Sequence, residues 1–210
     1  MASGDVAFGS AKFLAAGAAS DVGLVESCRG GDPQAFARLV SLHERMVFGL
    51  AARLLGDVEE ARDVSQDVFL QVYRALGRFE GRSSLKTWIY RICVNQCRNR
   101  RRFWRRRHSE FACPLELLTA ADEAELSAAR NEPSPFDGVA RRERSREVHA
   151  ALQRLSFDHR AILLLREVDG LSCEQIGSTL GLAEGTVKSR LARAREAFRR
   201  LVAPTLREDP

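Results

Sequence analysis

Hydrophobic residues recur every three or four positions through most of the first half of the chain, which is the spacing of an amphipathic helix. One such stretch covers residues 32–56, with an aspartate as N-cap, a proline after it and a glycine at its end. The pattern repeats over residues 57–77 and over 85–107, where Ser83 or Ser84 supplies the cap. No segment alternates polar and apolar residues as a strand does, so we expect an all-helical fold.

The second half of the chain ends in the pattern of a helix-turn-helix. Ser172 and Gln175 form a capping box that starts a short helix, and Gly181 can adopt the positive φ of a tight turn. A longer helix follows and runs to about residue 202, with an apolar stripe along one side. This stripe consists of Val187, Leu191, Ala194, Phe198 and Leu201.

The other side of this last helix is polar and basic. Away from the stripe lie Thr186, Ser189, Arg190 and Arg193, and Lys188 lies to one flank. In a helix-turn-helix, the N-terminal part of the second helix enters the major groove of DNA. The alternative is a cationic helix that is merely solvated in a bundle. The agreement of capping box, turn glycine and basic face favours the DNA-binding interpretation.

The composition changes between the two helical halves. Residues 109–137 are acidic, rich in alanine and interrupted by prolines, which is typical of a linker. We therefore expect two small helical domains joined by a flexible linker. The expected boundaries are a leader at 1–23, a first domain at 24–107, the linker at 108–138, a second domain at 139–203 and a tail at 204–210.

The net charge of +5, from 33 Lys and Arg against 28 Asp and Glu, is unevenly distributed. Residues 98–107, RNRRRFWRRR, form a dense arginine run that must be solvated or face an anion, and phosphate contact is its usual use. By contrast, residues 57–67 are strongly acidic, and the spacing of Asp63, Gln66 and Asp67 places them on one exposed helix face. Because such a face repels DNA, it suits a protein partner.

Other classes of function find little support in the residues. The five cysteines show no disulfide or zinc pattern, and Cys93 and Cys97 continue the apolar face of Leu85 and Ile89, so we expect them in the core. The four histidines are scattered, without a carboxylate pair, phosphate loop or metal spacing, so we expect neither catalysis nor a cofactor. No apolar run is long enough to span a bilayer and the leader lacks a secretory pattern, which favours the cytoplasm.

Two segments together resemble one known family. Residues 63–102, DVSQDVFLQVYRALGRFEGRSSLKTWIYRICVNQCRNRRR, resemble region 2 of the extracytoplasmic-function sigma factors of the sigma-70 family. Residues 155–198, LSFDHRAILLLREVDGLSCEQIGSTLGLAEGTVKSRLARAREAF, resemble their region 4. The resemblance implies a bacterial initiation factor that binds core RNA polymerase, selects a two-part promoter and helps to open it. The alternatives are a regulator that never joins polymerase and an enzyme on nucleic acid; the acidic face beside an arginine-rich helix argues against the first.

The resemblance also implies sites, position by position. Docking on the β′ subunit of core polymerase falls on Asp63, Gln66 and Asp67, and the β subunit is a further implied partner. Capture of an unstacked base of the −10 element, which needs an aromatic wall and amide hydrogen bonds, falls on Phe79, Ser83, Asn95 and Asn99. Recognition of the −35 element falls on Arg166, Thr186, Lys188, Ser189, Arg190 and Arg193. Among these, arginine is suited to reading guanine, and lysine and serine to fixing phosphates.

The family further implies an anti-sigma factor that occludes both domains, with no small-molecule substrate and no membrane insertion. Trp88 lies on the core stripe, and we interpret it as packing. Two positions depart from the family: Ala183 offers a weaker helix cap, and Gly177 replaces a usual alanine at a loss of about 0.5–1 kcal/mol in helix propensity. We expect both to affect stability and not DNA recognition.

Overall fold

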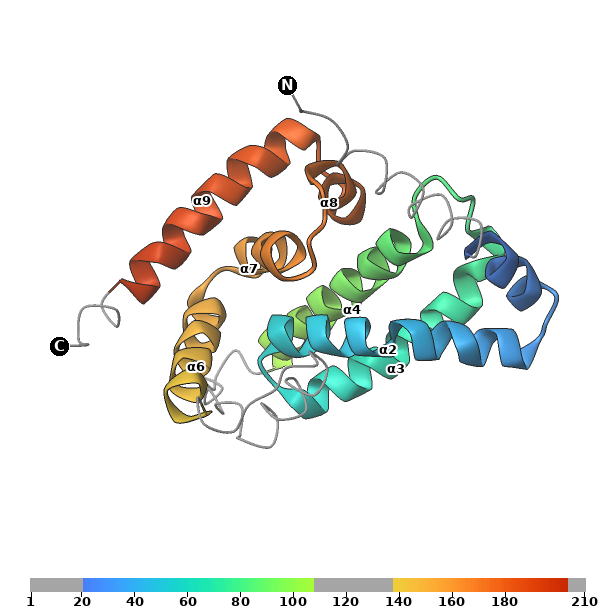
Figure 1. Cartoon of the computed structure of the whole chain (residues 1–210), viewed down its shortest axis with the longest axis horizontal. Coiled ribbons are helices and arrows are strands. Elements are labelled where there is room, and N and C mark those ends of the chain that lie inside the picture. The colour runs from blue at the N-terminus through green and yellow to red at the C-terminus, as the bar shows by residue number, and fades with distance from the viewer. Residues whose placement is uncertain (1–20, 108–137, 204–210) are drawn as a thin grey trace, which may run out of the picture.

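The computed structural model describes residues 21–107 and 138–203, and within these ranges every regular element is a helix (Figure 1). Residues 21–29 are helical. They are followed by α2 (Pro33–Leu55), α3 (Val58–Ala75), a 3₁₀ turn (Leu76–Arg78) and α4 (Leu85–Arg107). After the gap come α6 (Gly138–Arg154), α7 (Phe157–Leu163), a π-helical turn (Leu164–Val168), α8 (Cys173–Leu180) and α9 (Glu184–Val202). The expected all-helical fold is confirmed, while most of the expected leader, the linker and the tail lie outside the described residues.

The helices begin and end where the capping residues indicated. The Asp32 carboxylate accepts a hydrogen bond from the Gln34 amide at 2.8 Å, and Gly56 ends α2 with φ of 78°. Ser84, not Ser83, caps α4, because its Oγ accepts from the Thr87 amide at 3.1 Å. Ser156 caps α7 through the amide of His159 at 3.3 Å.

The helices α2, α3 and α4, which we call the first block, pack around one apolar core. The facing side chains include Leu39, Leu50, Val64, Val68 and Ile89. Cys93 and Cys97 are fully buried in this core, as predicted. A hydrogen bond with Cys97, and then burial, raise the pKa of the Cys93 thiol well above its ordinary value, so this thiol stays protonated and unreactive.

The helices α6 to α9, the second block, contain the predicted helix-turn-helix. The capping box of Ser172 and Gln175 is present, and Gly181 makes the turn with φ of 69°. Ala183 provides no side-chain cap for α9, as expected. For Gly177 the expectation of a simple loss was wrong: a Cβ there would lie 2.7 Å from the Leu182 carbonyl oxygen. The glycine therefore lets the turn fold back onto α8.

The two blocks share one continuous core. Helix α8 packs against α4, and α6 and α7 contact α2. In Figure 1, α7 and α8 lie between α9 and the helices of the first block. The domains that the sequence indicated as separately packed are therefore in direct contact. In the described parts of the chain, no helix is long and apolar enough to cross a membrane.

Candidate protein-binding and nucleic-acid surfaces

An acidic surface runs along the outer side of α3. The apolar residues of this helix, Ala61, Val64, Val68 and Val72, are buried against the rest of the first block. Because they occupy the inner face, Asp63, Gln66 and Asp67 point outward, and all three are exposed as predicted. We call these three residues the α3 acidic face.

Two exposed apolar side chains extend this face toward the end of α3. Leu70 is 53% exposed and Tyr73 is 63% exposed, an unusual exposure for side chains of this size. The Tyr73 ring stands edge-on to Phe36, with 5.1 Å between the ring centroids, so its position is defined. Sequence reasoning missed both residues, although they follow Gln66 and Asp67 at helical spacing and avoid the buried stripe. The surface therefore combines anionic and apolar contacts.

One arginine of the basic run binds the α3 acidic face within the chain. The Arg100 guanidinium lies 3.1 Å from the Glu60 carboxylate, 3.8 Å from Asp63 and 3.3 Å from Asp67. Its side chain is only 25% exposed, whereas those of Asp63 and Asp67 remain at least half exposed. Arg100 thus joins α4 to α3 and does not face a phosphate.

Two other arginines of the run face the second block. Arg98 lies 3.3 Å from the Asp158 carboxylate, and the guanidinium groups of Arg98 and Arg101 lie 5.5 Å and 5.8 Å from the Phe157 ring centroid. The interpretation of the whole run as phosphate-facing is therefore wrong, because successive helix positions point in different directions. The described members that remain exposed are Arg102, Arg105 and Arg106.

The residues assigned to the −10 element lie in the segment before α4 and along the middle of that helix. Phe79 is half-buried and packs on Trp88, with 5.1 Å between centroids. Asn95 and Asn99 are exposed one turn apart on the face of α4 that carries Trp88, seven residues earlier. Trp88 packs against the core as expected, and it also supports the Phe79 ring. This gives an aromatic wall followed by two amides along one helix face.

Ser83 belongs to the loop that leads to this face, and an unpredicted arginine from the helix of residues 21–29 contacts the start of that loop. Ser83 is half-buried, and its hydroxyl donates to the neighbouring Ser84 carbonyl at 3.4 Å, a weak contact. Arg29 donates to the Leu76 carbonyl at 3.2 Å and also to the carbonyl of Phe79. The helix of residues 21–29 therefore anchors the loop that positions Phe79, a long-range contact that local sequence patterns do not reveal.

Helix α9 presents the expected basic face. Val187, Leu191 and Ala194 are buried, while Ser189 and Arg193 are exposed on the opposite side. Thr186 is half-buried beside them, and its carbonyl accepts a hydrogen bond from the Ser189 hydroxyl at 3.1 Å. Three of the predicted −35 residues thus form one continuous face on the first turns of α9.

The other three predicted −35 residues do not share this face. Lys188 is exposed on the flank and pairs with Glu184 at 2.7 Å; this bond and charge raise the pKa of its ammonium group. Arg166 belongs to the π-helical turn, and it donates to the Leu171 carbonyl at 2.8 Å, which holds the loop before α8. Arg190 is half-buried and points between the blocks.

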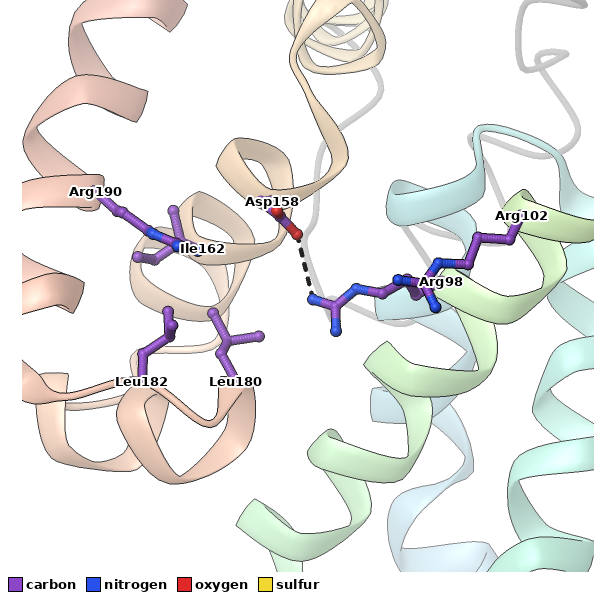
Figure 2. Close-up of a pocket in the computed structure, with 7 residues that line it drawn as sticks. All are labelled: Arg98, Arg102, Asp158, Ile162, Leu180, Leu182 and Arg190. Carbon is purple, nitrogen blue, oxygen red and sulfur yellow. Dashed lines mark hydrogen bonds and ion pairs between the residues drawn. The ribbon is translucent and has the colours of Figure 1, made fainter. Parts of the chain in front are cut away.

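A groove of about 280 Å³ lies between the two blocks. Figure 2 shows Arg98 and Arg102 reaching into it from α4, with Arg190 entering from α9. Asp158 is the carboxylate among the lining residues and pairs with Arg98. Across the residues that the structure describes, no group of three or more His, Cys, Asp or Glu side chains could hold a metal ion.

Comparison with known proteins gives the family. Residues 39–108 match sigma-70 region 2, and residues 145–198 match sigma-70 region 4. The chain is 39% identical over 192 residues to the RNA polymerase sigma-H factor of Pseudomonas aeruginosa, covering 90% of this chain and 96% of the relative. It is 35% identical over 190 residues to the ECF RNA polymerase sigma-E factor of Escherichia coli, covering 90% of this chain and 97% of the relative.

Two solved structures have the same fold at 24% identity. CnrH in complex with the cytosolic domain of CnrY superposes with a TM-score of 0.61, covering 88% of this chain and 97% of that one. The sigma factor RpoE in complex with the anti-sigma factor NepR from Bartonella quintana superposes with a TM-score of 0.63, covering 83% of this chain and 98% of that one. With both regions matched and such relatives along nearly its whole length, the chain belongs to the extracytoplasmic-function sigma factors of the sigma-70 family, which direct RNA polymerase in transcription initiation.

Proposed function

We propose that the α3 acidic face, extended by Leu70 and Tyr73, is the surface by which this sigma factor docks on the β′ subunit of core RNA polymerase. The observation that carries this assignment is the exposure of carboxylates and large apolar side chains on one helix face. Protein interfaces commonly combine an aromatic or apolar anchor with charges that orient the partner. The partner surface should therefore be basic with an apolar centre.

For the −10 element, the proposed pocket is the face formed by Phe79, Trp88, Asn95 and Asn99. A base that leaves the stack gains an aromatic surface from Phe79, while an amide can both donate to and accept from its edge. The loop that carries Phe79 is anchored by Arg29, which supports a position of Phe79 that does not depend on DNA. Ser83 lies in the same loop, and we assign it to the DNA backbone next to the flipped base.

Replacement of Asn95 by alanine is expected to weaken promoter opening by about 1 kcal/mol while leaving closed-complex formation unchanged, because the flipped base exists only after unpairing. Permanganate reactivity of the open region, measured with the holoenzyme, reports the opening step. Gln71→Ala is the matched control, since it removes an exposed amide from α3. Equal reactivity of the Asn95 variant and the control would place the pocket elsewhere.

For the −35 element, we propose that the face of Thr186, Ser189 and Arg193 enters the major groove. Arg193 is the candidate base reader, because it is exposed on that face and a guanidinium can donate two hydrogen bonds to guanine. Lys188 and Arg190 flank the face and are assigned to phosphates. Arg166 donates to the Leu171 carbonyl, and we propose that it contributes to DNA binding by supporting the loop that precedes α8.

Arg193→Ala is expected to cost roughly 1–3 kcal/mol of promoter affinity and to relax the preference at one base position. Lys188→Ala should instead weaken all promoters alike and reduce the salt dependence by about one charge. The measurement is holoenzyme affinity for single-base variants of the −35 element at several salt concentrations. Arg199→Ala, at the far end of α9, is the control. An equal loss on every promoter for Arg193→Ala would make it a phosphate contact.

The same assignments imply where the protein works and what restrains it. Core polymerase and promoters are cytoplasmic, so we propose that the chain is a cytoplasmic protein. One solved neighbour is a complex with an anti-sigma factor, which supports a partner of that kind for this chain. Such a partner would cover surfaces in both blocks.

A further inference from the structure

The groove between the two blocks carries more positive than negative charge. Arg98 and Arg102 extend into it from α4, and Arg190 enters from α9 (Figure 2). Asp158 is the carboxylate among the lining residues, so three guanidinium groups face one carboxylate and leave an excess of two positive charges. A concave surface with such an excess attracts anions.

Two of these arginines lack an anionic partner. In the parts of the chain that the structure describes, the guanidinium groups of Arg102 and Arg190 make no hydrogen bond or ion pair. Arg98 pairs with Asp158, but at 3.3 Å this contact is longer than the roughly 2.7–2.9 Å of a strong charge-assisted hydrogen bond. By contrast, Arg100 has three carboxylates within 3.8 Å. The arginines of the groove therefore retain donors that an anion can use.

Neighbouring arginines add to the positive potential of the groove. Burial, and then the charge of Arg105, lower the pKa of Arg101. Burial, and then the charge of Arg101, lower the pKa of Arg160 to about 10. Guanidinium groups along α4 and α7 are thus close enough to repel one another while they remain protonated at neutral pH. An anion bound in the groove would relieve this repulsion.

Buried side chains join the two walls of the groove. Arg160 is 2% exposed in α7, and its Nη1 donates to the Leu54 carbonyl at 2.6 Å, in the last turn of α2. Gln153 accepts from Arg160, and its Nε2 donates to the Arg53 carbonyl at 3.1 Å. Both carbonyls lie at the end of α2, where helix carbonyls lack partners within the helix. The arginines of the groove are therefore carried by helices that pack together.

The size of the groove limits what can occupy it. Its 280 Å³ equals the volume of roughly nine water molecules at about 30 Å³ each, which is room for a few linked phosphoryl groups. One turn of a protein helix with its side chains, about 10 Å wide and 5.4 Å long, already occupies roughly 400 Å³. Guanidinium groups bind phosphate oxygens through pairs of hydrogen bonds, so arginines that approach from two sides suit a phosphate chain.

We propose that the groove is a binding site for a small phosphorylated molecule, whose chain of linked phosphoryl groups lies between the α4 arginines, Arg98 and Arg102, and Arg190 of α9. A terminal phosphoryl group alone carries about two negative charges at neutral pH, enough to balance the excess of the lining residues. Leu180 and Leu182, at the lower edge of the groove in Figure 2, reduce the local dielectric and strengthen the attraction. The proposal does not depend on the promoter assignments, because Arg98 and Arg102 belong to none of them.

The test is isothermal titration calorimetry of the full chain with tripolyphosphate, in the absence of divalent cations. We expect one ligand per chain. Arg98→Gln, Arg102→Gln and Arg190→Gln should each weaken binding by about tenfold, because each removes a charged hydrogen-bond donor. Asp158→Asn should tighten binding by about threefold, because it removes the carboxylate that repels the ligand. Circular dichroism checks that each variant keeps its helicity.

The opposite effects expected for Arg98→Gln and Asp158→Asn separate ligand binding from a purely structural role. Both substitutions break the same ion pair, so damage to the packing would weaken binding in both variants. Arg38→Gln on α2 and Glu147→Gln on α6 make the same charge changes at exposed positions outside the groove. These two controls should leave the affinity unchanged.

A second titration, with ATP, identifies the source of the phosphate chain. Tighter binding of ATP than of tripolyphosphate indicates a nucleotide, whereas equal or weaker binding indicates an inorganic polyphosphate. The proposal is overturned if neither probe binds with one ligand per chain, or if Asp158→Asn weakens binding as Arg98→Gln does. It is equally overturned if the control variants change the affinity as much as the groove variants, because binding would then follow total charge.

Discussion

Replacement of both Asp63 and Asp67 by arginine is expected to abolish binding of the chain to core RNA polymerase while leaving its helicity unchanged. The double substitution reverses the charge of the α3 acidic face. It also places two cations beside Arg100, whose partners in the wild type are the carboxylates of Asp63 and Asp67. Like charges brought together at an interface cost several kcal/mol, so a loss of roughly 3 kcal/mol or more, over a hundredfold in Kd, is expected.

Pull-down on core polymerase measures this loss, and circular dichroism measures the helicity. Glu26→Arg with Glu44→Arg is the matched control, because both residues are exposed, lie outside α3 and change the net charge by the same amount. Retention of core binding by the α3 variant, with an unchanged spectrum, would remove the docking assignment. A loss shared by the control would show that total charge, and not this face, governs binding.

Leu191→Asp is expected to unfold the second block. Leu191 is 5% exposed on the buried stripe of α9, and an aspartate there loses apolar burial and places an unpaired carboxylate in the core. The two effects together amount to about 3–5 kcal/mol, a large part of the stability of a small domain. Hydrogen exchange should show lost amide protection throughout α7, α8 and α9.

The adjacent Ala192→Asp is the control for this experiment, because it introduces the same side chain at an exposed position of the same helix. It should keep the amide protection of the wild type. Because the blocks share one core, protection in α4, which packs on α8, should also fall in the Leu191 variant. Full protection of α8 and α9 in that variant would contradict the role of the stripe in holding the recognition helix.

Local chemistry explains why the helix ends were predictable. Asp32, Gly56 and Ser172 act on backbone groups within a few residues of themselves, so their roles can be inferred from the sequence. The buried stripe of α9 and its polar face follow equally from helical spacing. Gly177 was misjudged because the atom that it accommodates, the Leu182 carbonyl oxygen, is placed by the turn and not by the helix.

The contacts between the blocks could not be predicted in the same way. Arg160 lies 106 positions from Leu54, and Gln153 lies 100 positions from Arg53, so nothing in either segment indicates the other. In the sequence, Arg160 is one more arginine in a basic protein. Arg100 is an intermediate case, because its position one turn after the buried Cys97 indicates that it points inward. The identity of its partners on α3 required the packed structure.

The position of Arg100 has a consequence for the selectivity of the α3 acidic face. A tethered guanidinium next to Asp63 and Asp67 has a high effective concentration, so it competes with any cation that approaches these carboxylates. A single lysine or a metal ion from solution gains little by displacing it. A partner that presents several cations and an apolar surface for Tyr73 gains more binding free energy than the displacement of Arg100 costs. Arg100 thus favours partners with several cations over basic molecules that carry a single one.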